Sequence, residues 1–83
     1  MTNPKFLLRA EVPLTSRAVA PQGSLEAKTH WAEIQGTPGD GFFLVYLDES
    51  GRYLADDWAQ SLEDAKEIAE IGLRIRREAW ITV

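Results

Sequence analysis

Residues 42–56, "FFLVYLDESGRYLAD", decide the fold of this 83-residue chain. The first six of these residues are all apolar, which is typical of a strand that is covered on both faces. The tetrapeptide "DESG" at 48–51 is rich in turn-forming residues, and "RYLAD" at 52–56 again has strand character. We therefore predict a β-hairpin in which residues 42–47 pair with residues 52–56.

A helix is predicted directly after this hairpin, over residues 61–75. Its apolar residues recur at the spacing of three and four that places them on one face of a helix. Ser61 is the predicted N-cap, and acidic Glu63 and Asp64 suit the positive end of the helix dipole. Gly72 falls on the predicted buried face, which indicates a close approach of the helix to the sheet.

Further strands are predicted on both sides of this unit. Residues 6–12 alternate between two faces and end at Pro13, so they form a half-buried strand. Residues 15–26 are polar and broken by proline and glycine, which predicts a surface loop. Residues 27–35 predict a second strand, followed by a turn over "GTPGDG" at 36–41.

A short final strand is predicted at residues 79–83. The whole chain, 1–83, then forms a single small α+β domain of the order β-β-β-β-α-β. We expect one antiparallel sheet of four to five strands, with a single amphipathic helix packed on one face. Trp58 is expected under the first turn of the helix and Trp80 at its other end.

One face of this predicted sheet lacks a cover, because a single helix covers only one face. Strand 42–47 is apolar in both directions, and we expect the helix to leave Phe42, Leu44 and Tyr46 uncovered. Trp31 is a further candidate for this surface, and Ile71, just outside the apolar arc of the helix, is a further candidate for the interface. These five residues are the predicted partner-binding residues.

Three ways of covering that face remain open. A second protein or a second copy of the chain would bury it, the 15–26 loop would fold over it, or the sheet would curl around its own core. Burying three large apolar side chains contributes several kcal/mol at roughly 25 cal/mol per Å². We therefore expect a protein partner, with a homodimer favoured.

The net charge of −4 is concentrated between residues 40 and 64, a segment that we term the acidic belt. Arg52 is the only base of the belt. Because nucleic acids require a basic surface, we expect no nucleic-acid partner. An acidic docking face for a basic protein is the alternative use of the belt, with Asp48, Glu49, Asp56 and Asp57 as its residues.

No residue pattern in the chain predicts catalysis or metal binding. Cysteine is absent, and His30 is the only histidine. In a calcium loop that starts at Asp48, a glycine is needed at the sixth position and a glutamate at the twelfth, but the chain has Tyr53 and Ala59 there. We therefore expect no catalytic residue, no cofactor and no metal, and a protein that is not an enzyme.

The first residues show no signal peptide, and no apolar run is long enough to span a membrane. We therefore expect a bacterial cytoplasmic protein with no membrane association.

The segment "GFFLVYLDESGRYLADDWAQSLEDAKEIAEIGL", residues 41–73, resembles short uncharacterised bacterial proteins in which a tryptophan precedes an "SLE-A---AE" helix. It is more distantly similar to the sheet-helix unit of HicB-type antitoxins, although the proline-containing turn of that family is absent here. The resemblance implies a sheet-helix fold and assigns no functional residue.

These observations together predict a small protein-binding or self-assembling module. The alternative is a partner of the antitoxin or immunity type that uses the acidic belt. A small-ligand or metal-dependent enzyme built on Asp48, Glu49, Asp56 or Asp57 is the third and weakest hypothesis.

Overall fold

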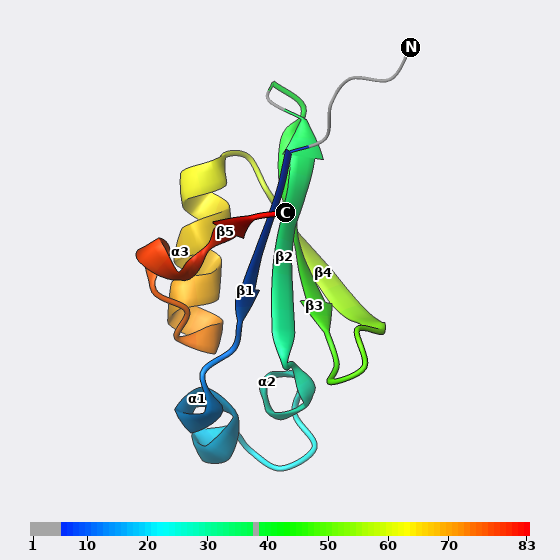
Figure 1. Cartoon of the computed structure of the whole chain (residues 1–83), viewed down its shortest axis with the longest axis vertical. Helices are drawn as coiled ribbons and strands as arrows, with labels where there is room; N and C mark the ends of the chain where they lie inside the picture. The colour runs from blue at the N-terminus through cyan, green and yellow to red at the C-terminus, as the bar shows by residue number, and fades with distance from the viewer. Residues whose placement is uncertain (1–5, 38) are drawn as a thin grey trace.

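Five antiparallel strands form one sheet in the order β4-β3-β2-β1-β5 (Figure 1). The computed structural model describes residues 6–37 and 39–83. The predicted α+β class, with a helix packed on a sheet of four to five strands, is confirmed. The strands are β1 (Phe6–Glu11), β2 (Trp31–Thr37), β3 (Gly41–Leu47), β4 (Tyr53–Ala59) and β5 (Ile81–Thr82).

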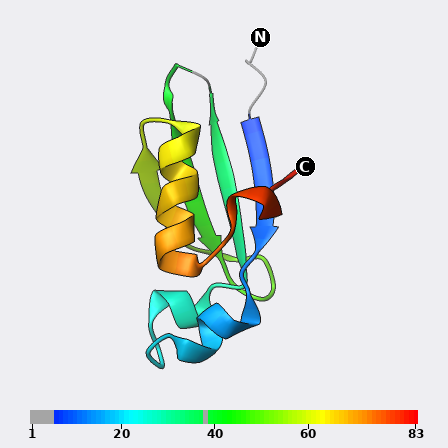
Figure 2. The same ribbon diagram turned by 90° about the vertical axis from the view of Figure 1, so that its left-hand side faces the viewer.

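The long helix α3 (Leu62–Leu73) lies on one face of the sheet, as Figure 2 shows. Its N-terminus is capped as predicted, because the Ser61 Oγ accepts a 3.1 Å hydrogen bond from the backbone N–H of Asp64. The helix ends at Leu73, where Arg74 takes the left-handed conformation with φ 58°. A single 3-10 turn, η1 (Arg77–Ala79), then leads into β5.

Two short helices replace the predicted surface loop over residues 15–26. They are α1 (Leu14–Val19) and α2 (Leu25–Lys28), and they lie together beyond one end of the sheet (Figure 1). Ser24 caps α2, since its Oγ accepts from the backbone N–H of Ala27 at 3.2 Å. The prediction that β2 begins at residue 27 is wrong for the same reason, because residues 25–28 belong to α2.

The hydrophobic core lies between α3 and the sheet. It includes Leu44, which is fully buried, and Phe42 and Tyr46, which are 8% and 6% exposed. The prediction that these three residues form the uncovered face is therefore wrong. They lie beneath α3, together with Ala65, Ala69 and Leu73 of the helix and Leu8, Ala10, Ala32 and Ile34 of β1 and β2.

The strand register explains which side of β3 lies beneath α3. Ile34 lies directly opposite Leu44, and Phe42 lies opposite Ala59. Residues that are directly opposite in an antiparallel pair point to the same face. The apolar run of β3 has no polar side to mark its outer face, so its neighbours decide the outcome.

Two smaller predictions also fail. Gly72 is on the exposed side of α3, and a Cβ added there would meet no atom within 4 Å, so it does not mark a close approach to the sheet. Trp58 belongs to β4 and is 57% exposed, so it does not pack beneath the first turn of α3. Trp80 does lie in the core, with 9% of its surface exposed.

Candidate protein-binding face

The side of the sheet that faces away from α3 forms a surface that we term the open sheet face. In Figure 1, α3 lies to the left of the sheet, and no helix of the described residues lies on the other side. The strand pairing places on this face Leu7, Arg9 and Glu11 of β1, Trp31, Glu33 and Gln35 of β2, Phe43, Val45 and Leu47 of β3, and Tyr53, Asp56 and Trp58 of β4.

Three aromatic side chains of this face are exposed. Phe43, Trp58 and Tyr53 expose 45%, 57% and 61% of their surface. Phe43 and Trp58 lie directly opposite each other on β3 and β4. Exposed tryptophan and tyrosine side chains on one surface are typical of protein interfaces.

The Trp58 indole lies against the backbone of Gly41. A Cβ added at Gly41 would lie 2.5 Å from the Trp58 Nε1, so only glycine leaves room for the ring. Gly41 also has φ +98°, which an L-residue with a side chain rarely adopts. The indole is thus held in position although more than half of its surface is exposed.

A β-bulge brings Tyr53 and Asp56 to the same face. Tyr46 pairs with Ala55 and Leu47 pairs with Tyr53, so Leu54 is an extra residue in β4. The Tyr53 hydroxyl donates a 2.6 Å hydrogen bond to the Asp56 Oδ2. This hydrogen bond to a carboxylate raises the pKa of Tyr53 above its ordinary value.

A buried carboxylate occupies the middle of the open sheet face. Glu33 is 8% exposed and forms an ion pair with Arg9, whose Nε donates to the Glu33 Oε2 at 2.9 Å. The Gln35 Nε2 donates to the other oxygen, Oε1, at 3.0 Å. Both carboxylate oxygens therefore have donors, which offsets the cost of burying the charge.

Three of the four charged residues of this face lie in one row across the strands, and the fourth, Glu11, lies in the row of Trp31. Arg9 is opposite Glu33, Glu33 is opposite Val45, and Val45 is opposite Asp56. A cation on β1 and an anion on β4 are therefore separated by three strand spacings, roughly 14 Å. The aromatic pair Phe43 and Trp58 forms part of the next row.

The structure separates the predicted partner-binding residues. Trp31 lies on the open sheet face and is partly buried, whereas Ile71 is 78% exposed on α3, on the other side of the sheet. Phe43, Tyr53 and Trp58 were missed. The alternation of side chains in β2 would have revealed Phe43. Ala32 and Ile34 point to one face of the sheet, and Trp31 and Glu33 point to the other. Once β2 is paired with β3, this alternation assigns a face to each residue of β3.

The four predicted docking acids do not form one cluster. Asp48 and Glu49 lie in the β3–β4 turn, and Asp56 and Asp57 point to opposite faces of β4. The Asp48 Oδ1 accepts hydrogen bonds from the backbone N–H groups of Arg52 and Ser50 and from the Ser50 hydroxyl, which together lower the pKa of Asp48.

Asp57 also has a local partner, since its Oδ2 accepts a 2.6 Å hydrogen bond from the Tyr46 hydroxyl. Within residues 6–37 and 39–83, no group of three or more His, Cys, Asp or Glu residues is placed to hold a metal ion. Three of the four acids thus contribute to local structure, through a turn or a tyrosine hydroxyl.

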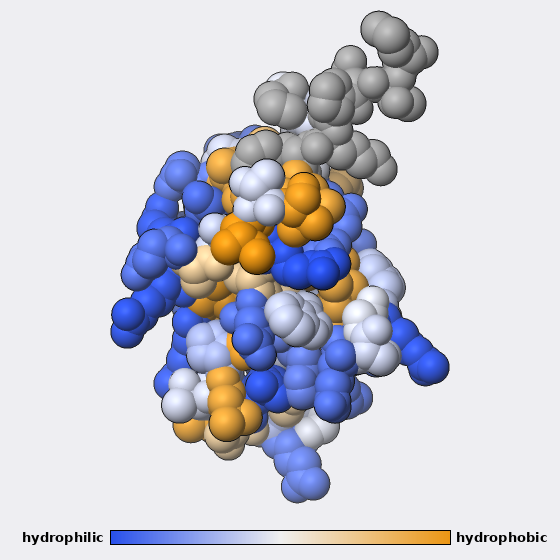
Figure 3. All heavy atoms as spheres, viewed as in Figure 1, coloured by the Kyte–Doolittle hydropathy of each residue, from blue (hydrophilic) through white to orange (hydrophobic). Residues whose placement is uncertain are grey.

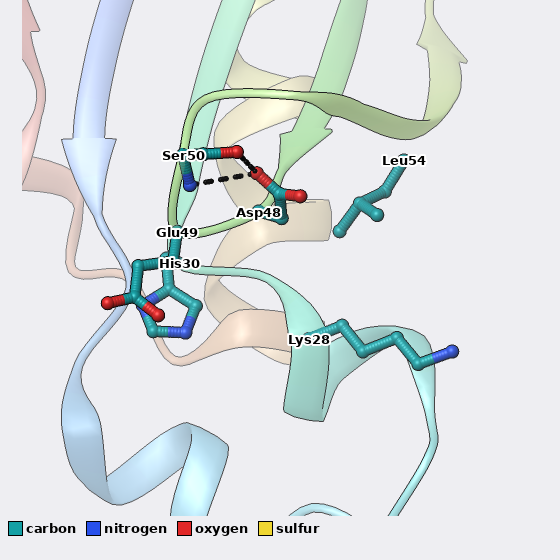
Figure 4. Close-up of a pocket in the computed structure, with 6 residues that line it drawn as sticks. All are labelled: Lys28, His30, Asp48, Glu49, Ser50 and Leu54. Atoms are coloured by element: carbon teal, nitrogen blue, oxygen red, sulfur yellow. Dashed lines mark hydrogen bonds between the residues drawn. The ribbon is translucent and has the colours of Figure 1, made fainter.

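An open depression of about 630 Å³ lies at the end of the sheet nearest α2. Its lining residues are Lys28, His30, Asp48, Glu49, Ser50 and Leu54. Figure 4 shows that the Lys28 ammonium group points away from the Asp48 carboxylate. The Arg17 Nη1 lies 3.0 and 3.2 Å from the two ring nitrogens of His30. The ionisable groups around the depression therefore do not converge on one point.

Apolar atoms are also exposed near the C-terminus. Figure 3 shows them gathered where β5 and the C-terminus lie, and Ile81 and Val83 are 63% and 61% exposed. Ile81 pairs with Arg9, so it extends the charged row of the open sheet face by one strand.

No helix in the described part of the chain is both long enough and apolar enough to cross a membrane. No family model matches the chain, and no curated protein or solved structure matches it significantly.

Proposed function

We propose that this chain is a non-enzymatic protein-binding module and that the open sheet face is its contact surface. The observation that carries this proposal is the exposure of Phe43, Tyr53 and Trp58 together on a sheet face without a covering helix in the described part of the chain. Aromatic side chains supply most of the binding energy in many protein interfaces, and they are costly to leave in water.

The fixed position of these groups supports a binding role. Trp58 is held against Gly41, Tyr53 is hydrogen-bonded to Asp56, and Arg9 is paired with Glu33. A partner that binds here does not have to order these side chains, so less conformational entropy is lost on association.

The mixture of apolar and charged groups supports a protein partner rather than a nucleic acid. Arg9 is the only base among the side chains that define the open sheet face, and it is paired with Glu33. Phosphate groups require several uncompensated cations, whereas protein interfaces combine aromatic residues with a few charges.

Photocross-linking in cells tests the proposal. The photoreactive residue p-benzoylphenylalanine is placed at Phe43 in one variant and at Ile71 in a matched control, since both positions are exposed but lie on opposite sides of the sheet. We expect a discrete adduct at position 43, with its second chain and contact residue identified by mass spectrometry, and no comparable adduct at position 71. An adduct at position 71 alone, or none at either, would refute the proposal.

A further inference from the structure

We infer that the partner of the open sheet face is a second copy of this chain, in a two-fold arrangement that sets Arg9 of each copy against Asp56 of the other. This inference rests on the proposed function, because it names the partner that the same face binds. The order of charges across the sheet is the observation that carries it.

The charged row of the face is complementary to itself. Arg9 lies on β1 and Asp56 on β4, with Glu33 and Val45 between them. In the proposed dimer, two sheets are stacked face to face and the two-fold axis lies in the plane between them. The axis runs parallel to the strands and passes between β2 and β3, so it exchanges the two ends of the row. It therefore places the cation of one copy over the anion of the other at both ends.

The same axis matches the other two rows. In the row of Phe43 and Trp58, it sets Leu7 of one copy over Trp58 of the other, and Gln35 over Phe43. In the row at the opposite end of the strands, it sets Trp31 over Leu47. The axis also sets Glu11 over Tyr53 in that row, whereas the other facing pairs of these two rows join apolar side chains with apolar or amide groups.

Sheet twist does not remove this match. Stacked sheets are rotated by about 30° relative to each other. Arg9 and Asp56 lie about 7 Å from the axis, so that rotation displaces them by roughly 4 Å. The long, flexible arginine side chain spans such a displacement.

Both charged groups have capacity for a second interaction. Arg9 uses its Nε and Nη2 on Glu33 and keeps 44% of its side chain exposed. A guanidinium has five N–H donors, so its Nη1 donors are directed elsewhere. Asp56 is exposed, and Tyr53 donates to only one of its two carboxylate oxygens.

Two other symmetric arrangements bring like charges together. An axis across the strands at the level of the charged row would stack Arg9 on Arg9 and Asp56 on Asp56. Edge-to-edge pairing of β4 would centre on Asp56, the middle residue of Tyr53–Ala59. When the two β4 strands overlap almost completely, Asp56 or Asp57 lies opposite an aspartate of the other copy. Like charges that lie directly opposite each other are destabilising.

The size of the face and its few anchoring side chains together limit the expected affinity. Four strands about 4.8 Å apart and about six residues long give a flat footprint of roughly 20 by 20 Å. Side-chain relief enlarges this area, but the interface stays at the lower end of specific protein contacts. We therefore expect a dissociation constant on the order of micromolar.

Sedimentation equilibrium over a range of concentrations tests the association. Wild type is expected to be a dimer with a micromolar dissociation constant. Asp56→Arg sets two arginines against each other at both ends of the row and is expected to weaken the dimer roughly tenfold to hundredfold. Glu67→Arg makes the same charge change on the exposed side of α3 and is expected to leave the dimer unchanged.

Cross-linking of an Arg9→Lys variant with a carbodiimide tests the arrangement. This reagent joins an amine to a carboxylate in direct contact. A link from the introduced amine to Glu33 of the same chain serves as the internal control, because the wild-type residues are in contact. A link from that amine to Asp56 is expected only in the dimer, because the roughly 14 Å between β1 and β4 prevents it within one chain.

Three results would overturn the inference. They are a wild type that stays monomeric at hundreds of micromolar, an Asp56→Arg variant that dimerises as tightly as Glu67→Arg, and an Arg9→Lys dimer in which the introduced amine is linked to Glu33 alone. If the photoreactive residue at position 43 is joined to a different protein while the wild type is monomeric, the proposed function stands and this inference fails. If it forms no adduct, the proposed function fails as well.

Discussion

The Tyr46 hydroxyl donates a 2.6 Å hydrogen bond to the Asp57 Oδ2 at the edge of the sheet. Tyr46 is 6% exposed. Burial, followed by the hydrogen bond to Asp57 and the negative charge of that carboxylate, raises the pKa of Tyr46 well above its usual value near 10. The folded protein therefore favours the protonated phenol.

This raised pKa predicts a loss of stability at alkaline pH. An unfolded tyrosine ionises near pH 10, whereas the folded Tyr46 ionises at a higher pH. The contribution of Tyr46 to the free energy of unfolding is therefore fully present below about pH 10 and decreases as the pH rises further. Tyr46→Phe should lower the free energy of unfolding by about 1 kcal/mol at pH 7 and make the decline above about pH 10 shallower. Urea denaturation at a series of pH values measures both effects.

Tyr53→Phe is the matched control for this prediction. The Tyr53 hydroxyl also donates to an aspartate at 2.6 Å, but the side chain is exposed, so water replaces the lost interaction. We expect a smaller change in the alkaline profile. An equal change in both variants would contradict the role given to burial at Tyr46.

Gly41→Ala is predicted to destabilise the protein by two separable effects. The positive φ of Gly41 costs about 1 kcal/mol for a residue with a side chain, and the new Cβ displaces the Trp58 indole. The second effect should vanish when Trp58 is replaced by alanine. A double-mutant cycle followed by denaturation should therefore show a smaller cost of Gly41→Ala in the Trp58→Ala background.

Gly51→Ala isolates the backbone effect in this cycle. Gly51 has φ +89°, and an added Cβ would meet no atom within 4 Å. We expect its cost to be the same with and without Trp58. If Gly41→Ala shows the same additivity, the indole does not rest on Gly41 in solution.

The N-cap of α3 gives a third prediction. Ser61→Ala removes the 3.1 Å hydrogen bond to the Asp64 N–H and should lower the free energy of unfolding by about 1 kcal/mol. Ser61→Asp keeps an acceptor at the cap and should retain most of the stability. Equal losses in the two variants would mean that the hydroxyl is needed for something other than capping.

Local signals in the sequence were sufficient for several elements. The cap at Ser61 and the apolar spacing after it predict α3, and the alternation over residues 6–12 predicts β1 with its inner face. Both signals depend on residues close together in the chain. The sheet-helix architecture follows from them, because an amphipathic helix has to bury its apolar stripe.

The site could not be predicted in the same way, because it depends on contacts between strands. Strand 42–47 is apolar on both sides, so its own residues do not distinguish Leu44 from Phe43. The register with β2 makes that distinction, and a shift of one residue would exchange the two faces. The bulge at Leu54, which brings Tyr53 and Asp56 together, is likewise visible only after β3 and β4 are paired.

The orientation of β3 in the sheet gives the last prediction, because it places Leu44 beneath α3 and the neighbouring Phe43 on the open sheet face. Leu44 is fully buried beneath α3, so Leu44→Ala leaves a cavity and should lower the free energy of unfolding by about 2–5 kcal/mol. Phe43 is 45% exposed on the open sheet face, so Phe43→Ala should cost clearly less in the monomer. Denaturation at the lowest practical protein concentration compares the two variants without a contribution from association. If Phe43→Ala proves the more destabilising, the register between β2 and β3 is shifted by one residue and the open sheet face carries Leu44 instead.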